Sequence, residues 1–388
     1  MFILEEPYVS QLLADTAVEL GLPVLDTPMA RAALADREAR IVGDAEFALA
    51  AIAPGARVYA NSENAIGWIA EHLAGSELPE RIGLFKDKVA FRELIADMHP
   101  DYRFAGVPLA DLAAFDTTAL RPPFVVKPAV GFFSVGVRVV ATHEEWPGVV
   151  ADIEAEVAAK RAMYPEQVLD LDRFVVEEVI DGEEFAVDAY FDGEGTPVLV
   201  NVLAHRFASA DDVSDRVYYT SVDVIDRVGP IALEYLAEIG ARAGLAHFPM
   251  HAEIRIDASG AVGAVEINPM RFGGWCATDL AYFAYGVNPY RCYLRGECPD
   301  WERIRAERAG RVTAMIVADL PGSIDRARIA GVDLDAFAAR FSHVLELRPT
   351  DAARYGVFAF TFVDVPADDF GELDAVLGED LSRYVTLA

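Results

Sequence analysis

The stretch that decides the fold runs from residue 251 to residue 269: His251-Ala-Glu-Ile-Arg-Ile-Asp, then Ala258-Ser-Gly-Ala, then Val262-Gly-Ala-Val-Glu-Ile-Asn-Pro. The middle segment supplies a turn, because Ser259-Gly260 can form a two-residue connection between antiparallel strands. The whole stretch therefore predicts a β-hairpin in which the residues on either side of this turn pair with each other.

The turn sets the register of the hairpin. Counting outward from it, Glu253 lies directly opposite Glu266, and His251 lies opposite Asn268. Directly opposed side chains of antiparallel strands share one face of the sheet, with Cβ atoms about 5 Å apart. We therefore expect Glu253, Glu266 and Asn268 to converge on one patch.

This group of side chains suits a divalent cation. Two carboxylates that face each other across a ladder repel, and one of them would normally take up a proton unless a cation removes the conflict. Two acidic ligands and an amide oxygen, with the other positions left to water and phosphate oxygens, are the way Mg²⁺ is usually held. The alternative is a solvated face of an edge hairpin; the register and the Glu266-Ile-Asn-Pro run favour the metal.

Composition and charge narrow the classes of function. The chain has 388 residues, 53% of them apolar, and no run approaches the eighteen or so apolar residues of a membrane-spanning helix. Lys and Arg number 33 against 63 Asp and Glu, a net charge of −30 that disfavours nucleic acid and membrane as partners. Three cysteines without C-x-x-C spacing predict neither a disulfide framework nor a zinc site. The acidic start lacks the basic region of a secretory signal, so we expect a cytoplasmic protein.

The order of expected elements indicates three regions. Residues 1–87 alternate short apolar strands with helices, as in a small parallel α/β layer. Residues 88–300 form the main domain, with a compact α+β lid at about 122–180 and a helix over Pro230–Ala243 that has proline in its first turn. Residues 301–388 are expected to be an α+β region that completes the main domain or is appended to it.

Two lysines and a loop are candidates for binding phosphate. Lys127 follows the apolar strand Phe124-Val-Val and precedes Gly131-Phe-Phe-Ser-Val-Gly, a loop whose N–H groups and Ser134 hydroxyl could wrap phosphate oxygens. Lys88 opens a helix, where a cation opposes the macrodipole, so its placement is a weak pointer to function. The alternatives are a structural lysine at a strand end and a surface lysine at a helix start.

A connector and the strand after it offer further ligands. Arg173-Phe-Val-Val-Glu-Glu-Val-Ile-Asp-Gly-Glu-Glu places Glu177 and Glu178 just past a buried strand, where the backbone could meet an adenine edge. Glu184 lies on the polar face of the following strand and could accept hydrogen bonds from ribose hydroxyls. An acidic loop in an acidic protein is the alternative.

Two arginines are candidates to clamp a carboxylate or an acyl phosphate, because the guanidinium fork matches those groups. Arg271 closely follows the expected metal ligands, and Arg255 shares a face with Glu253. For Arg255, pairing with Asp257 or Glu253 is the alternative.

In their order and spacing, these residues resemble an ATP-grasp enzyme. The resemblance runs from about Lys88 to Arg271 and rests on Phe124-Val-Val-Lys-Pro with its loop, on Val176-Glu-Glu-Val-Ile-Asp-Gly-Glu-Glu, and on the hairpin. It implies an α/β and α+β architecture: a parallel N-terminal domain, a small lid, a central catalytic domain built on an antiparallel sheet, and the C-terminal α+β region. Two departures from the family pattern are Phe132-Phe133 in the loop and Met270 before Arg271.

The resemblance also implies a role for most candidates with ATP and Mg²⁺, which Mn²⁺ could replace. It implies that Lys88 and Lys127 bind the ATP phosphates, that Glu177 and the backbone at Glu178 and Ile180 contact the adenine, and that Glu184 contacts the ribose. It also implies that Glu253, Glu266 and Asn268 bind the metal and that Arg271 stabilises the acyl phosphate. Ser134 and Arg255 remain candidates on the chemistry of their side chains alone.

The implied activity is that of a carboxylate–amine ligase. A substrate carboxylate attacks the γ-phosphorus of ATP, and an amine then attacks the acyl phosphate. Small-molecule acids and amines are the expected partners. The sequence does not decide whether the chain forms a homodimer. The alternatives are other ATP-grasp chemistry, such as a carboxylase or phosphotransferase, and a sensor that binds ATP without turnover. The sequence identifies neither the acid nor the nucleophile.

Overall fold

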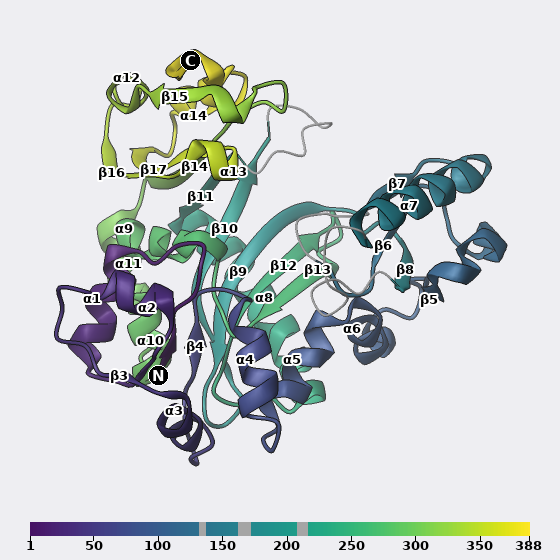
Figure 1. Ribbon diagram of the computed structural model, residues 1–388, viewed down its shortest axis with the longest axis horizontal. Coiled ribbons are helices and arrows are strands. Elements are labelled where there is room, and N and C mark those ends of the chain that lie inside the picture. Colours follow the sequence, from purple (N-terminus) through teal and green to yellow (C-terminus); the bar gives the residue numbers. More distant parts are fainter. Residues whose placement is uncertain (132–136, 162–171, 208–215) are drawn as a thin grey trace.

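The structure is a computed structural model that describes residues 1–131, 137–161, 172–207 and 216–388. An N-terminal unit, a lid and a large central sheet follow one another along the chain, and the C-terminal region returns to the central sheet (Figure 1). Within these described residues, no helix is long and apolar enough to cross a membrane.

The N-terminal unit is built on a parallel sheet with strand order β3-β2-β1-β4, which confirms the expected parallel layer. Its strands are short and almost wholly buried, as parallel strands covered by helices are. The strands are β1 Phe2–Ile3, β2 Val24–Leu25, β3 Ile41–Val42 and β4 Tyr59–Ala60. The helices are α1 Gln11–Leu20, α2 Pro28–Ala33, α3 Asp44–Ala51, α4 Ala65–His72 and α5 Leu78–Lys86.

The lid is an antiparallel sheet of order β5-β8-β6-β7 whose apolar face packs on one long helix. Its elements are β5 Phe104–Pro108, β6 Phe124–Pro128, β7 Arg138–Val140, α7 Trp146–Arg161 and β8 Arg173–Glu178, and α6 Lys88–Leu94 precedes them. Strand β5 lies before residue 122, so the lid sheet begins earlier than predicted. The strand was missed because Gly106 and Pro108 are residues that strands disfavour.

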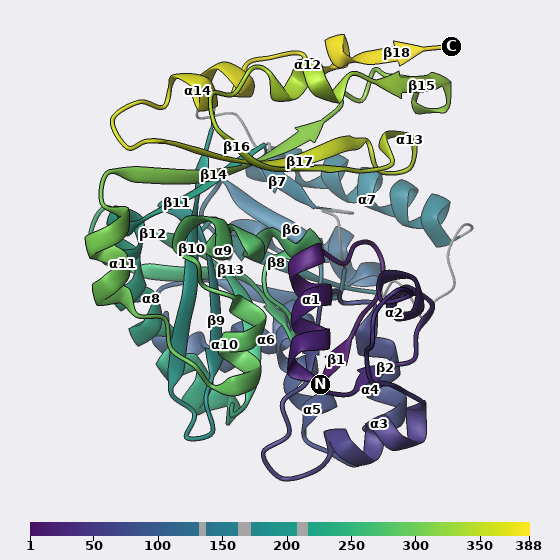
Figure 2. The ribbon, with the colours of Figure 1, turned by 90° about the vertical axis from the view of Figure 1, so that its left-hand side faces the viewer.

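The central sheet has the order β13-β12-β9-β10-β11-β14-β17-β16, and all neighbouring strands are antiparallel. The first five strands in sequence are β9 Glu183–Phe191, β10 Pro197–Arg206, β11 Val217–Ser221, β12 Phe248–Ile256 and β13 Val262–Pro269. The other three are β14 Arg311–Asp319, β16 Val344–Pro349 and β17 Val357–Pro366. Since these last strands come from the region after residue 300, that region completes the sheet, as Figure 2 shows.

Helices and a small ribbon cover the ends and faces of the central sheet. The remaining helices are α8 Val222–Ala243, α9 Leu280–Tyr285, α10 Pro289–Arg295, α11 Trp301–Arg308, α12 Leu334–Ala338, α13 Ala352–Tyr355 and α14 Gly371–Leu377. Strands β15 Ile329–Val332 and β18 Val385–Leu387 pair with each other. Helix α8 starts earlier than its predicted beginning at Pro230, because the Ser221 side chain caps it by accepting a hydrogen bond from the Val224 N–H. The proline therefore lies inside the helix.

The loop of the β12–β13 hairpin differs from the prediction. The Asp257 N–H donates to the Ala261 carbonyl at 3.0 Å, so three residues, Ala258–Gly260, connect the strands instead of two. Gly260 has φ 87°, a left-handed conformation that glycine adopts without steric cost. The prediction was wrong because a Ser-Gly pair also fits the end of this longer loop.

The predicted pairing of the two glutamates is nevertheless confirmed. Next to the loop the strands pair one residue away from the predicted register, with Ile254 opposite Ala264. A β-bulge at Val265 then places one extra residue in β13. Beyond this bulge, Glu253 lies opposite Glu266. The longer loop shifts the register by one residue and the bulge shifts it back, so the pairing at Glu253 is as predicted.

Candidate active site

The candidate metal ligands lie on one face of β12 and β13. Glu253 and Glu266 oppose each other, and the Asn268 side-chain amide donates to Glu253 Oε1 at 3.4 Å. Burial raises the pKa of Glu253 to about 7, with repulsion from Glu266 as the second cause. Among the described residues no cluster of three His, Cys, Asp or Glu could hold a metal ion. The available metal ligands are the carboxylates of Glu253 and Glu266 and the amide oxygen of Asn268. Such oxygen ligands suit a hard divalent cation such as Mg²⁺.

The two lysines singled out in the sequence lie beside this group. Lys88 Nζ is 3.4 Å from Glu266 Oε2, and Lys127 Nζ is 2.7 Å from Glu177 Oε1. Burial lowers the pKa of Lys127, and the charge of Lys88 acts in the same direction. The two ammonium groups are therefore close enough to bind different phosphate groups of one polyphosphate. Ser134 falls outside the described residues.

Glu177 lies in the protein interior, where it binds cations. Its carboxylate lies between Lys127 and Arg92, which donates from Nε at 2.6 Å. Burial would raise the pKa of Glu177, but the charges of Arg92 and Lys127 outweigh it and lower the value to about 2. The side chain thus contacts Lys127 and Arg92, and its contact with adenine stays a prediction.

Arg92, on α6, is a residue that the sequence analysis missed. Its side chain is 3% exposed. The guanidinium donates to the carbonyls of Ala264 and Val265 at 2.7 and 3.3 Å, in addition to its ion pair with Glu177. Arg92 therefore links strand β8 of the lid to the bulge that sets the register of the glutamates. Sequence reasoning had no signal for it, because an arginine in an amphipathic helix is usually exposed.

The predicted adenine connector already makes hydrogen bonds within the protein. The Glu178 carboxylate accepts from Arg121 at 3.1 Å, and its backbone carbonyl accepts from the Tyr102 hydroxyl at 2.8 Å. The Ile180 carbonyl accepts from Arg255 Nη1 at 2.8 Å.

Arg255 lies with the residues predicted for adenine and ribose. Its Nε donates to Glu184 Oε2 at 2.9 Å across the β12–β9 ladder. Its partner is thus Glu184 on β9, and neither Asp257 nor Glu253 as the sequence suggested. Because this ion pair occupies its guanidinium, Arg255 is poorly placed to act as the cationic clamp.

Arg271 meets the N-terminal unit instead. Its Nη2 is 3.3 Å from Glu63 Oε1, and Lys86 Nζ is 2.6 Å from the other oxygen of Glu63. Burial would raise the pKa of Glu63, but Arg271 and Lys86 outweigh it and lower the value. The charge of Arg271 also lowers the pKa of Glu253, so this group of three lies near the metal candidates.

A buried histidine–aspartate pair supports the same face of the sheet. His251 Nδ1 is 2.7 Å from Asp188 Oδ1, which also accepts from the Gly273 N–H at 2.9 Å. His251 lies opposite Asn268, as predicted. The pair connects the metal candidates to the loop that carries Arg271.

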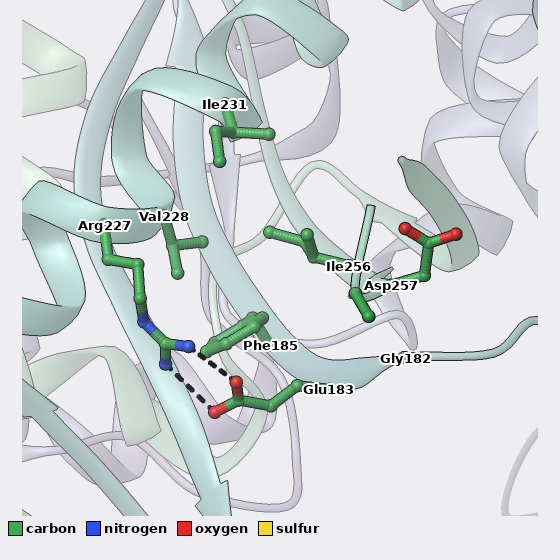
Figure 3. A pocket seen from close by; sticks show the side chains of 9 residues that line it. Gly182, Glu183, Phe185, Arg227, Val228, Ile231, Ile256 and Asp257 are labelled. Carbon is green, nitrogen blue, oxygen red and sulfur yellow. Dashed lines mark hydrogen bonds and ion pairs between the residues drawn. The ribbon is translucent and has the colours of Figure 1, made fainter. Parts of the chain in front are cut away.

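A separate cavity of about 370 Å³ lies on the other face of the sheet. Figure 3 shows its apolar lining, with Phe185 from β9 and Val228 and Ile231 from α8, and the ion pair of Arg227 with Glu183 at its rim. Neighbouring residues of a strand point to opposite faces, so this cavity does not belong to the face that carries Glu184.

Comparison with known proteins agrees with this geometry. Residues 120–279 match the model of the ATP-grasp domain family. This segment is therefore similar to the ATP-grasp domain, and the structure has the ATP-grasp fold. No curated protein sequence matches the chain.

Solved structures of the same fold cover nearly the whole chain. An L-amino acid ligase from Bacillus licheniformis is 18% identical, with TM-score 0.69 over 100% of this chain and 98% of that one. An N5-carboxyaminoimidazole synthase from Aspergillus clavatus, solved with ADP, is 14% identical, with TM-score 0.64 over 98% and 97%. A biotin carboxylase from Campylobacter jejuni, solved with an ATP ligand, is 13% identical, with TM-score 0.60 over 94% and 87%.

Proposed function

We propose that the protein is an ATP-dependent carboxylate–amine ligase. It activates a small carboxylic or amino acid as an acyl phosphate and transfers the acyl group to an amine. ATP is its phosphoryl donor and Mg²⁺ its metal, with Mn²⁺ as a substitute. Among proteins of this fold, the L-amino acid ligase and the ADP-bound synthase have related chemistry in their names.

One observation supports this proposal above the others. Each glutamate of the opposed pair has a cation near it: Lys88 Nζ is 3.4 Å from Glu266, and the charge of Arg271 acts on Glu253. A metal ion held there would neutralise charge on the transferring phosphoryl oxygens. A second anion, the substrate carboxylate, could then approach from the side of Arg271.

The other residues of this chain have supporting roles. Lys88 and Lys127 supply positive charge to the phosphates, and Glu177 with Arg92 keeps Lys127 in place. The lid sheet, which carries Lys127 on β6 and Glu177 on β8, covers the phosphates and limits attack by water on the acyl phosphate.

The test is phosphate release from ATP with Mg²⁺ and a two-dimensional panel of carboxylic acids and amines, amino acids included. A ligase releases phosphate only when an acid and an amine are both present, and mass spectrometry finds the amide. Release with bicarbonate and no organic acid would instead identify a carboxylase. Binding of ATP without release under any condition would identify a sensor. Either of these results overturns the proposal.

A further inference from the structure

The contact between Glu63, Lys86 and Arg271 joins two distant parts of the chain. Glu63 follows β4 at the edge of the N-terminal parallel sheet where loops after strands gather, a common place for ligands in open α/β sheets. Its two oxygens bind Lys86 Nζ at 2.6 Å and Arg271 Nη2 at 3.3 Å. The three side chains are 24%, 17% and 15% exposed, so each still reaches solvent.

The charges of this group are unbalanced. Lys86 and Arg271 share the one carboxylate of Glu63, so these three side chains together carry a charge of +1 in a protein whose net charge is −30. The Glu63 carboxylate shows that the ammonium group of Lys86 and the guanidinium group of Arg271 are placed to bind a carboxylate between them. A further carboxylate beside Glu63 would neutralise the remaining charge.

Lysine is rare in this chain, and most of the lysines lie near the candidate site. The chain has four lysines against 29 arginines, and Lys86, Lys88 and Lys127 all belong to this region, while Lys160 lies in α7. Lysine supplies a compact, mobile point charge, whereas arginine supplies a rigid fork. This bias is the sequence signal that could have identified Lys86.

Lys86 and Lys88 serve different acids although only Asp87 separates them. Asp87 caps α6 by accepting from the N–H groups of Val89 and Ala90 at 2.8 and 3.2 Å. The break between α5 and α6 that this cap stabilises sends Lys86 to Glu63 and Lys88 to Glu266.

We propose that Lys86 and Arg271 together bind the carboxylate of the acid substrate, and that Glu63 positions both. This proposal rests on the proposed function and assigns to Lys86 the clamp role that the sequence analysis gave to Arg255. The substrate carboxylate then lies beside the metal ligands, while Lys88 and Lys127 hold the phosphates.

The kinetic test compares two neighbouring lysines. With the acid and amine that support turnover, Lys86→Met raises the KM of the acid about tenfold or more, which corresponds to one charge-assisted contact, and leaves the KM of ATP within about twofold. Lys88→Met instead raises the KM of ATP about tenfold or more and leaves the KM of the acid within about twofold. Arg81→Met removes a half-buried cation of the same helix that pairs with the exposed Glu77, and it changes neither KM. An acid KM in Lys86→Met within about twofold of the wild type overturns the proposal.

A binding test separates this inference from the proposed function. If no acid of the panel supports turnover in the wild type, acetate serves as the probe on protein saturated with ADP and Mg²⁺, with chloride at equal ionic strength as the reference. Acetate then raises the melting temperature of the wild type and of Arg81→Met but not of Lys86→Met, which supports the clamp while the ligase proposal fails. An equal rise in Lys86→Met, or none in the wild type, overturns the clamp.

Discussion

The pKa of Glu253 reflects both the burial of the candidate metal site and the charges around it. Its pKa of about 7 lies above the usual value near 4.5, because burial and Glu266 both oppose its charge. In the absence of metal, the protonated form therefore stabilises the folded protein below pH 4.5, and this contribution disappears as the pH rises through 7. A divalent cation reverses the balance, since it needs the ionised form.

At the residue scale we predict that Mg²⁺ raises the melting temperature more at pH 8 than at pH 6, because at pH 6 the cation must displace the proton of Glu253. Differential scanning calorimetry at the two pH values measures this. Glu253→Gln is the matched control: it removes the repulsion without changing the size of the side chain, so without Mg²⁺ it melts above the wild type at pH 8 and responds little to the cation. Equal Mg²⁺ shifts at both pH values in the wild type would contradict the assignment.

At the element scale, the hairpin shows what local sequence can predict. The residues of β12 and β13 predicted the hairpin itself. The predicted pairing of Glu253 with Glu266 is correct because the loop, predicted one residue too short, and the bulge at Val265 offset each other. The bulge at Val265 could not be foreseen, since nothing in that strand marks it. It lies against α6, where Arg92 donates hydrogen bonds to the carbonyls of Ala264 and Val265.

We therefore predict that Arg92→Met both destabilises the fold and impairs the site. Removing one partner of a buried ion pair costs about 3 kcal/mol, measured by urea unfolding. Because Lys127 and the bulge lose their common support, the KM of ATP and the Mg²⁺ concentration for half-maximal activity also rise.

Arg216→Met is the matched control for Arg92. Arg216 also binds one carboxylate, that of Asp319, and backbone carbonyls, but in the C-terminal region. It is expected to lose stability and to keep its ATP and Mg²⁺ dependence. If the two variants lose stability alike and neither changes these dependences, the role of Arg92 is structural only.

At the scale of the whole molecule, the sequence predicted the parts better than their contacts. The parallel N-terminal layer, the antiparallel hairpin and the ATP-grasp fold were all predictable, because each depends on local pattern or on spacing within one segment. The completion of the central sheet by β14, β17 and β16 was left open, since pairing between distant strands leaves no local pattern.

The same limit explains which contacts of the site the sequence did not predict. Glu63 and Arg271 are 208 residues apart in sequence, and only the fold brings them together. Arg255, predicted to act near the acyl phosphate, instead pairs with Glu184 on a neighbouring strand. In a protein of net charge −30, acids are abundant, so the partner of any one arginine depends on tertiary structure.

The central claim is that Glu253 and Glu266 hold a divalent ion beside the phosphates of ATP. Mn²⁺ binding, followed by electron paramagnetic resonance with a non-hydrolysable ATP analogue, tests it most directly. Glu266→Ala should weaken Mn²⁺ binding at least about tenfold and abolish ATP turnover. Glu183→Ala, on the opposite face of the sheet and paired with Arg227, should bind as the wild type does. Unchanged Mn²⁺ affinity with normal turnover in Glu266→Ala would contradict the account.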